Sequence, residues 1–337
     1  MLLLLLLLLA GCGGSSSERS PAGLPASPDW RAASAKEEGL DPGVLAEADR
    51  RARTEFQGVA SLLVARHGRL VFERYYRGVG AGDRLPVYSI TKSVISALVG
   101  IAVADGSLQS IDQRLLHFLP EGFGSATDVR ARRITLHHLL TMTAGYFRSP
   151  AIRADDPVRD LINRPLVSDP GTTFSYDGGS SDLLSAVLTR ATRMTAAAYA
   201  ERHLFGPLGI HGARWASQAD GFSQGDVGLA LRPRDLLAFG QLYLDRGTWR
   251  GRRVLPASWV AVSTREQVSV GHDVWFGYHW WIVHDPVRFF AALGYGGQAV
   301  VVVPRLDEVV VVTGSSDDPT PRFTLARLVM HATGGAG

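Results

Sequence analysis

The sequence predicts an α/β protein of the α+β type, in which helices flank one antiparallel sheet and a helical subdomain is inserted into it. Three observations predict this fold. Runs rich in β-branched and apolar residues, typical of strands, occur at 58–78 and again at 275–314. The segment between them, 89–247, has mostly helical patterns. Short turns separate the C-terminal runs, so we expect the N- and C-terminal segments to form a single antiparallel sheet.

The N-terminal part of the fold is predicted to be a helix, a strand hairpin and a second helix. The first helix is expected at 40–53, because Asp41 and Pro42 stand in the cap and first-turn positions. Two strand-like runs within 58–78 flank a His-Gly pair that is typical of a hairpin turn. The second helix is expected at 89–106.

The middle of the chain is predicted to be helical. A short apolar helix lies within 134–146 and is closed by Gly145, and a looser stretch containing Arg, Asp and Pro follows at 147–173. Further helices are expected at 180–192, 198–210 and 232–247. Asp235, close to the start of the last of these, is interpreted as a helix cap.

The C-terminal part is predicted to supply most of the sheet. Four strand-like runs are expected at 275–283, 287–293, 296–304 and 307–314. A final amphipathic helix is expected at about 321–333.

Composition is typical of a globular protein with a sizeable core. The chain has 337 residues, of which 46% are hydrophobic and 20% are charged, enough for one large domain or two modest ones. The net charge is only +3, and arginines alternate with acids without a long basic block. The sequence therefore gives little support to nucleic-acid binding. It favours no particular oligomeric state.

The first twelve residues are predicted to be an export signal. Their eight consecutive leucines are too few to span a bilayer as a helix, although no positive charge precedes them. The segment LAGC at residues 9–12 resembles a bacterial lipoprotein signal, in which the cysteine is lipidated and becomes the first mature residue. The alternative is a simple secretory signal with an incidental cysteine. Cys12 is the only cysteine, so no intramolecular disulfide can form.

The rest of the chain is predicted to be a tether and one domain. Residues 13–37, rich in Gly, Ser, Pro and Ala, are interpreted as a flexible tether. The domain itself is expected at 38–334. We therefore expect an exported protein of the cell envelope or periplasm, held at the membrane by a lipid on Cys12.

A serine and a lysine stand three residues apart at the start of the predicted helix 89–106. The chain has only two lysines, Lys36 and Lys92, and all its other basic residues are arginines. On a helix, Ser89 and Lys92 share a face and can touch. A helix N-terminus also favours negative charge, which suits a serine that carries a developing oxyanion.

The chemistry explains why the basic residue at this position is a lysine. A neutral lysine amine can accept the serine proton, and burial or neighbouring dipoles favour that neutral form. Arginine stays protonated and cannot do so. A bare S-x-x-K match also fits an ordinary N-cap serine followed by a surface lysine. The choice between a catalytic and a structural pair therefore depends on the rest of the sequence.

Five segments in order resemble the serine β-lactamase-related superfamily, which includes class C β-lactamases, penicillin-binding proteins, esterases and 6-aminohexanoate-dimer hydrolases. They are VYSITKSVISALVGIAVADG, ITLHHLLTMTAGY, FSYDGGSSDLLSAVL, RPRDLLAFGQLYLDRGTWRGRRVLPASWV and GYGGQAVVVVPRLDEVVVVTG. The resemblance covers about 38–334, and the combination is specific although each piece alone is not. It implies the β-lactamase/transpeptidase-like fold.

The resemblance also implies an acyl-transfer mechanism. Ser89 matches the nucleophile of the S-x-x-K motif, and Lys92 matches its lysine. Tyr176 in FSYDGG matches the tyrosine of the Y-x-N motif, which moves a proton between the serine and the leaving group. The alternative for Tyr176 is a core aromatic residue with a hydrogen-bonded hydroxyl.

The family's third motif, K/H-T-G, lies on a sheet strand that faces the serine, and it aligns with 292–294. The backbone N–H of Tyr295 would then join that of Ser89 as the oxyanion hole. By the same resemblance Gly178, Gly294 and Gly296 are expected to contact substrate.

Two departures from the family pattern affect the expected substrate. Gly178 replaces the asparagine of Y-x-N, and Ala292 replaces the cation of the third motif. In β-lactamases and peptidases of the family those groups help to hold the substrate's amide and carboxylate. The GYGGQ form is closer to the esterase and aminohexanoate-hydrolase branch, so we expect a hydrolase of small-molecule esters or small amides.

Two other functions stay open at this point. One is a β-lactamase or D,D-carboxypeptidase, and the other is a non-catalytic envelope protein that keeps the fold. The intact Ser89, Lys92 and Tyr176 argue against the second.

Other candidate residues are interpreted as structural. His137 and His138 occupy a position where the family has packing and capping residues, and no further ligand stands at metal spacing. His272, His279 and His284 are scattered without a convincing partner, and Asp155 and Asp156 are expected in a solvated loop. An aromatic cluster is read as sheet packing, with one or two rings bordering the cleft; its members are Trp275, Phe276, Tyr278, Trp280 and Trp281. No glycine-rich phosphate loop or cofactor signature is present, so we expect no cofactor and no metal.

Overall fold

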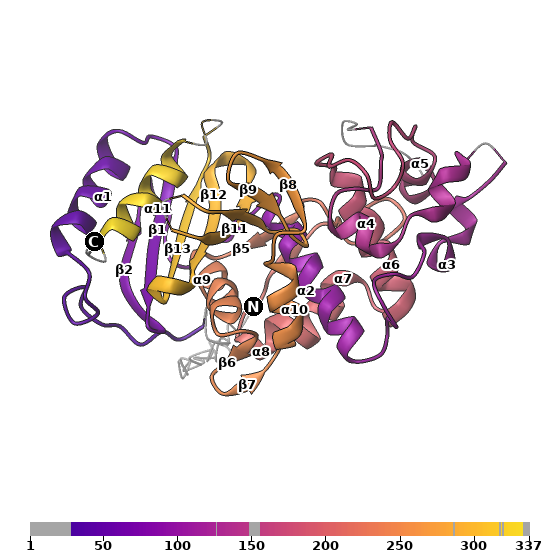
Figure 1. The fold of residues 1–337 in the computed structure, drawn as a ribbon. Helices are drawn as coiled ribbons and strands as arrows, with labels where there is room; N and C mark the ends of the chain where they lie inside the picture. Colours follow the sequence, from indigo (N-terminus) through magenta and orange to yellow (C-terminus); the bar gives the residue numbers. More distant parts are fainter. Residues whose placement is uncertain are drawn as a thin grey trace, which may run out of the picture.

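The fold is built on one eight-stranded antiparallel sheet (Figure 1). The computed structural model describes residues 28–125, 127–147, 156–285, 287–316, 318 and 320–332. The strand order is β2-β1-β13-β12-β11-β10-β9-β8. The two N-terminal strands therefore join the C-terminal ones through the β1–β13 pair, in which Leu63 lies opposite Val311. This confirms the predicted α+β fold.

The strands of this sheet and the helices that matter for the site have the following bounds. The strands are β1 Val59–Arg66, β2 Arg69–Tyr75, β8 Val268–Gly271, β9 Val274–Phe276, β10 Trp281–Val283, β11 Phe289–Gly294, β12 Gln298–Val303 and β13 Glu308–Gly314. The longer helices are α1 Pro42–Thr54, α2 Ile90–Ala104, α6 Gly178–Thr192, α9 Pro233–Leu244 and α11 Thr320–Ala332. Shorter helices are α3 Leu115–Phe118, α4 Leu136–Leu140, α5 Pro157–Ile162, α7 Ala196–Ala200, α8 Gly206–Leu208 and α10 Ala257–Ser263. Small strands outside the main sheet are β3 Leu85–Pro86, β4 Arg214–Trp215, β5 Leu229–Leu231, β6 Thr248–Trp249 and β7 Arg252–Arg253.

Helices cover both faces of the sheet, which explains the unbroken valine runs of β12 and β13. Val310 and Val312 belong to one core cluster, together with apolar residues of α1 and α11. Val309 and Val311 belong to the other, together with residues of α2 and α9. Because successive residues of a strand point to opposite faces, a strand buried on both sides has no polar alternation.

The inserted helices form a separate lobe beside the sheet. In Figure 1 helices α3 to α7 gather on the side away from α1 and α11, and α2 runs between this lobe and the sheet. Helix α2 contacts both α6 and β11. Helix α2 therefore lies where the sheet and the lobe meet.

Several sequence predictions are corrected in detail. The run at 275–283 is two strands, β9 and β10, because the chain reverses at 277–280, where His279 has a φ of 60°. The short strand β8 precedes them and was not predicted. The looser stretch 147–173 contains α5, whose N-cap is Asp156 and whose first residue is Pro157. The run at 198–210 is divided into α7, a π-helical turn and α8.

Asp235 has the expected capping role, but it lies in the first turn of α9 and is not the N-cap residue. Its carboxylate accepts the backbone N–H of Arg232, the N-cap residue of α9, at 3.0 Å. Among the described residues, none of the helices is long and apolar enough to cross a membrane.

Candidate active site

Ser89 is the N-cap residue of α2, but its side chain forms no capping hydrogen bond. The residue before it, Tyr88, has a φ of 48°, a left-handed conformation that costs free energy for a non-glycine residue. The hydroxyl instead accepts a hydrogen bond from Lys92 Nζ at 3.0 Å. The serine and lysine therefore touch, as their i, i+3 spacing predicts.

Lys92 is a buried lysine, and among the described residues no carboxylate oxygen lies within 4.0 Å of its amine. It is only 3% exposed. Besides Ser89 Oγ, its amine donates to the backbone carbonyl of Asp226 at 2.8 Å and lies 5.4 Å from the ring centroid of Tyr176. A hydroxyl, a carbonyl and an aromatic ring thus surround the nitrogen.

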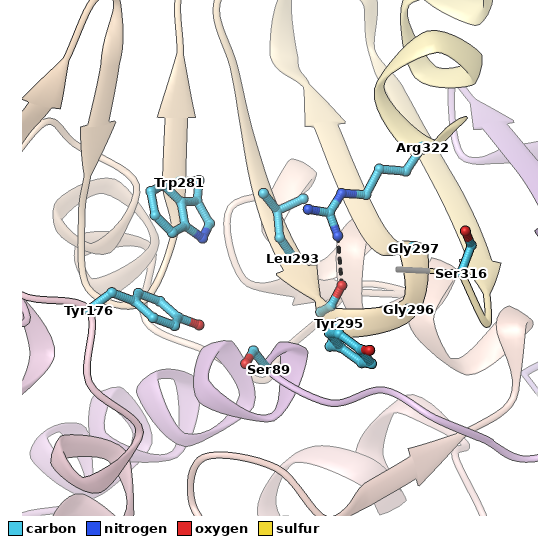
Figure 2. Close-up of a pocket in the computed structure, with 10 residues that line it drawn as sticks. Ser89, Tyr176, Trp281, Leu293, Tyr295, Gly296, Gly297, Ser316 and Arg322 are labelled. Carbon is cyan, nitrogen blue, oxygen red and sulfur yellow. Dashed lines mark hydrogen bonds between the residues drawn. The ribbon is translucent and has the colours of Figure 1, made fainter. Parts of the chain in front are cut away.

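Tyr176 lies across the pocket from Ser89, just before α6. Its ring stacks on Trp281 at 5.6 Å, and its hydroxyl points toward Ser89 (Figure 2). The next residue, Asp177, caps α6 and forms a buried bidentate ion pair with Arg164, at 2.6 and 2.9 Å. Burial alone would raise the pKa of Asp177, but the hydrogen bonds and charge of Arg164 outweigh it and lower the pKa. This ion pair fixes the backbone that presents Tyr176.

The end of β11 approaches the segment that leads into Ser89. A Cβ on Gly294 would lie 2.3 Å from the carbonyl oxygen of Val87, so this close approach requires glycine. The ring of Tyr295 packs edge-on against Tyr88, with centroids 5.5 Å apart. The residue after it, Gly296, has a φ of 76°.

A cavity of about 320 Å³ lies above Ser89 (Figure 2). Its lining residues are Ser89, Tyr176, Trp281, Leu293, Gly294, Tyr295, Gly296, Gly297, Ser316 and Arg322. The predicted nucleophile, the predicted tyrosine and both residues expected to donate backbone N–H groups therefore border one pocket. Trp281, a member of the predicted aromatic cluster, lines this cavity, and the ring of Phe276 packs against Trp281 with centroids 5.0 Å apart.

Of the three glycines expected to contact substrate, Gly294 and Gly296 line the cavity, whereas Gly178 is not among its described lining residues. Gly178 is the first residue of α6, and a Cβ there would lie 2.7 Å from Oδ2 of Asp226. A carboxylate from another loop thus occupies the space next to position 178.

Asp226 belongs to a carboxyl pair near Lys92 that the sequence did not indicate. Asp182, on α6, accepts the backbone N–H groups of Gly225 and Asp226 at 2.7 and 3.2 Å. Burial and the neighbouring charge of Asp226 raise the pKa of Asp182 to about 7. The two carboxyls come from segments 44 residues apart, so spacing along the chain gave no signal.

Arg322, on α11, is a further residue that sequence reasoning missed. Among the described lining residues of the cavity it is the one with a charged side chain. Its Nη1 donates to the carbonyl oxygen of Gly294 at 2.7 Å. Burial lowers the pKa of Arg322, although the nearby Tyr176 acts in the opposite direction.

His279 has partners, contrary to the sequence interpretation. Its fully buried ring places Nδ1 2.9 Å from the carbonyl oxygen of Lys92 and Nε2 3.2 Å from that of Leu139. Burial lowers the pKa of His279 to about 4. His284 also has a partner, since its Nε2 lies 3.0 Å from Glu266 Oε1.

The remaining candidates take structural positions or lie outside the described residues. His138 Nδ1 accepts the backbone N–H of Thr135 at 3.3 Å, a capping contact of α4. Within the described ranges no group of three or more His, Cys, Asp or Glu side chains could hold a metal ion. Cys12 and Asp155 lie outside the described residues.

Comparisons with known proteins agree on one family. The family model described as Beta-lactamase matches residues 46–334. The chain is 25% identical over 334 residues to the 6-aminohexanoate-dimer hydrolase of Paenarthrobacter ureafaciens, which covers 91% of this chain and 83% of that protein. It is 30% identical over 189 residues to esterase EstB of Burkholderia gladioli, covering 47% of each.

Solved structures agree on the fold. A class C β-lactamase superposes with a TM-score of 0.72 at 15% identity, covering 88% of this chain and 97% of that chain. At this identity the likeness concerns the fold alone.

Proposed function

Because this chain belongs to the β-lactamase family and is a serine hydrolase, we propose that it hydrolyses esters or small amides through an acyl-enzyme on Ser89. The observation that carries the proposal is the 3.0 Å contact between Ser89 Oγ and the amine of the buried Lys92. Similarity to a 6-aminohexanoate-dimer hydrolase and an esterase supports this substrate class.

Acylation begins when Ser89 Oγ attacks the substrate carbonyl carbon and gives its proton to the amine of Lys92, which acts as the base. The carbonyl π electrons move to oxygen, and the backbone N–H groups of Ser89 and Tyr295 stabilise that oxyanion. The tetrahedral intermediate then collapses and the bond to the leaving group breaks. The leaving alkoxide or amine takes up the proton, which Lys92 returns through Tyr176.

Deacylation repeats these steps with water. A water molecule gives a proton to the Lys92 and Tyr176 pair while its oxygen attacks the acyl carbon. The bond to Ser89 Oγ breaks, the serine recovers its proton, and the carboxylic acid leaves. The net reaction consumes one water and yields an acid with an alcohol or amine.

Labelling with a fluorophosphonate probe, followed by peptide mapping, tests the nucleophile. We expect label on the peptide that contains Ser89 and none in Ser89→Ala. Ser110→Ala, which changes a partly exposed loop serine away from the pocket, is the control and should label like the wild type. Full labelling of Ser89→Ala would reject the assignment.

A β-lactamase or D,D-carboxypeptidase is the second candidate, because the family model that matches residues 46–334 is described as Beta-lactamase. Gly178 and Ala292 remove two of the polar groups that the family's β-lactamases use, so we expect esters to react faster. A side-by-side rate screen of p-nitrophenyl esters, a chromogenic cephalosporin and small linear amides separates the candidates. Faster turnover of the cephalosporin would favour the second one.

The sequence pattern alone supports an exported location and a lipid anchor on Cys12. Metabolic labelling with a palmitate analogue in a bacterial host tests this proposal. We expect labelling of the wild type at the membrane, and no labelling of Cys12→Ser. Equal labelling of both would reject the anchor.

A further inference from the structure

We infer that Arg322 is a positioning residue for the oxyanion hole, acting through the peptide group between Gly294 and Tyr295. This inference rests on the proposed function, because it assigns a role within the acyl-transfer site. It is carried by the hydrogen bond from Arg322 Nη1 to the Gly294 carbonyl oxygen, at 2.7 Å (Figure 2).

The carbonyl of Gly294 and the N–H of Tyr295 belong to one peptide group. That group is planar, and in the trans form its C=O and N–H point in opposite directions. A hydrogen bond that holds the oxygen therefore also sets the direction of the N–H on the other side. A cationic donor on the oxygen, moreover, draws electron density toward it and makes the N–H a stronger donor.

This peptide group lies where the sheet no longer orients the chain. The β11–β12 register ends at the pair Gly294 and Gln298, and Tyr295 begins the turn between the two strands. The close approach to Val87 fixes one side of Gly294. Arg322 supplies a constraint on its carbonyl from a different element, α11.

The guanidinium has no ion pair with a carboxylate among the described residues, although the side chain is half-buried at the pocket. Its Nε is buried without a hydrogen-bond partner in the described protein. Burying an unpaired cation costs free energy. The hydrogen bond to the Gly294 carbonyl oxygen offsets part of that cost and orients the guanidinium toward this peptide group.

The experiment compares two substrates with each variant. An oxyanion hole discriminates between p-nitrophenyl butyrate and its thionoester, because sulfur accepts hydrogen bonds from backbone N–H groups poorly. With Arg322→Gln we expect kcat/KM for the ester to fall about tenfold to a hundredfold, less than the loss of a whole oxyanion donor. We expect the thionoester rate to change less than about threefold, so that the ester-to-thionoester ratio falls.

The ratio is independent of how much enzyme is folded, because both substrates report on the same sample. Arg84→Gln is the matched control, since Arg84 also has a buried Nε without a partner and donates to a backbone carbonyl, that of His211 at 3.2 Å. Arg84→Gln should leave the ester-to-thionoester ratio unchanged. Arg322→Lys keeps the charge and a donor, so its ratio should lie between those of Arg322→Gln and the wild type.

Each outcome decides a separate point. If Arg322→Gln slows both substrates equally, Arg322 is only structural, and if it slows neither, the hydrogen bond is irrelevant to the reaction. Either result overturns the inference while leaving the proposed function intact. Hydrolysis that persists in Ser89→Ala would instead reject the proposed function itself.

Discussion

The carboxylate of Asp226 occupies the space that a side chain at position 178 would need. A Cβ built on Gly178 lies 2.7 Å from Asp226 Oδ2 and 3.2 Å from Asp226 Cβ. Where the family pattern has an asparagine, this chain therefore has a glycine with a polar group from another loop beside it. Positions 178 and 226 must therefore change together if the family's asparagine is to be restored at position 178.

Gly178→Asn is expected to destabilise the fold by about 1–3 kcal/mol, the usual cost of overpacking. Combining it with Asp226→Ala should recover most of this loss, because the added side chain then has room. Gly82→Asn is the matched control, since a Cβ at Gly82 contacts nothing within 4 Å. Urea denaturation of the wild type, Gly178→Asn, Asp226→Ala and the double variant measures the coupling, and additive losses in the double variant would contradict the steric explanation.

Glu308 should make stability fall as the pH rises. Its carboxyl is buried in β13 with no hydrogen-bond partner in the described protein, and burial raises its pKa from 4.5 to about 8. Between these values the folded protein holds a proton that the unfolded chain releases. The stabilisation is therefore complete below about pH 4.5 and is lost as the pH rises through about 8.

Glu308→Gln removes this titration while keeping the shape of the side chain. We expect the free energy of unfolding of the wild type, relative to the variant, to drop on the order of 2 kcal/mol between pH 5 and pH 8. Urea denaturation at several pH values measures the difference. A constant difference across this range would show that Glu308 is ionised in the fold.

His279 should matter for both stability and acylation. Its neutral ring lies between the carbonyl oxygens of Lys92 and Leu139 and donates its one N–H to one of them, so it packs the first turn of α2 against α4. His279→Asn keeps a residue that tolerates the positive φ at this position. The loss of the ring's hydrogen bond is expected to cost about 1–3 kcal/mol.

We also expect slower fluorophosphonate labelling of Ser89 in His279→Asn, because Lys92 loses its support. His284→Asn, at an exposed pair with Glu266, should change neither quantity appreciably. An unchanged labelling rate in a destabilised His279→Asn would mean that the ring supports the fold but not the reacting groups.

The sequence predicts those parts of the site that depend on local spacing. Ser89 and Lys92 meet because they lie one helical turn apart. The glycines at the end of β11 were predicted from the order of the family motifs along the chain. Arg322 and Asp226 reach the site from α11 and from the loop before β5, and no pattern along the chain connects those segments to Ser89. They depend on strand pairing and loop paths, which single-sequence reasoning does not determine.

Some of the missed features did have a local signal. Asp156 followed by Pro157 is a typical helix start, and it could have predicted α5 within the stretch read as loose. The aromatic run at 275–283 favoured a single strand because aromatic residues have high strand propensity. The left-handed backbone at His279, which breaks the run, is held by buried contacts with α2 and α4 that the propensities do not contain.

The most direct test of the central claim replaces Lys92 by arginine and measures the rate at which Ser89 is acylated by a p-nitrophenyl ester, by intact-protein mass spectrometry. An exposed Arg53→Lys variant is the reciprocal control and should acylate at the wild-type rate. Arginine keeps the charge but cannot take the serine proton, so we expect Lys92→Arg to acylate about a hundredfold to ten-thousandfold more slowly. Acylation of Lys92→Arg at the wild-type rate would contradict the proposal that a lysine amine receives the proton of Ser89.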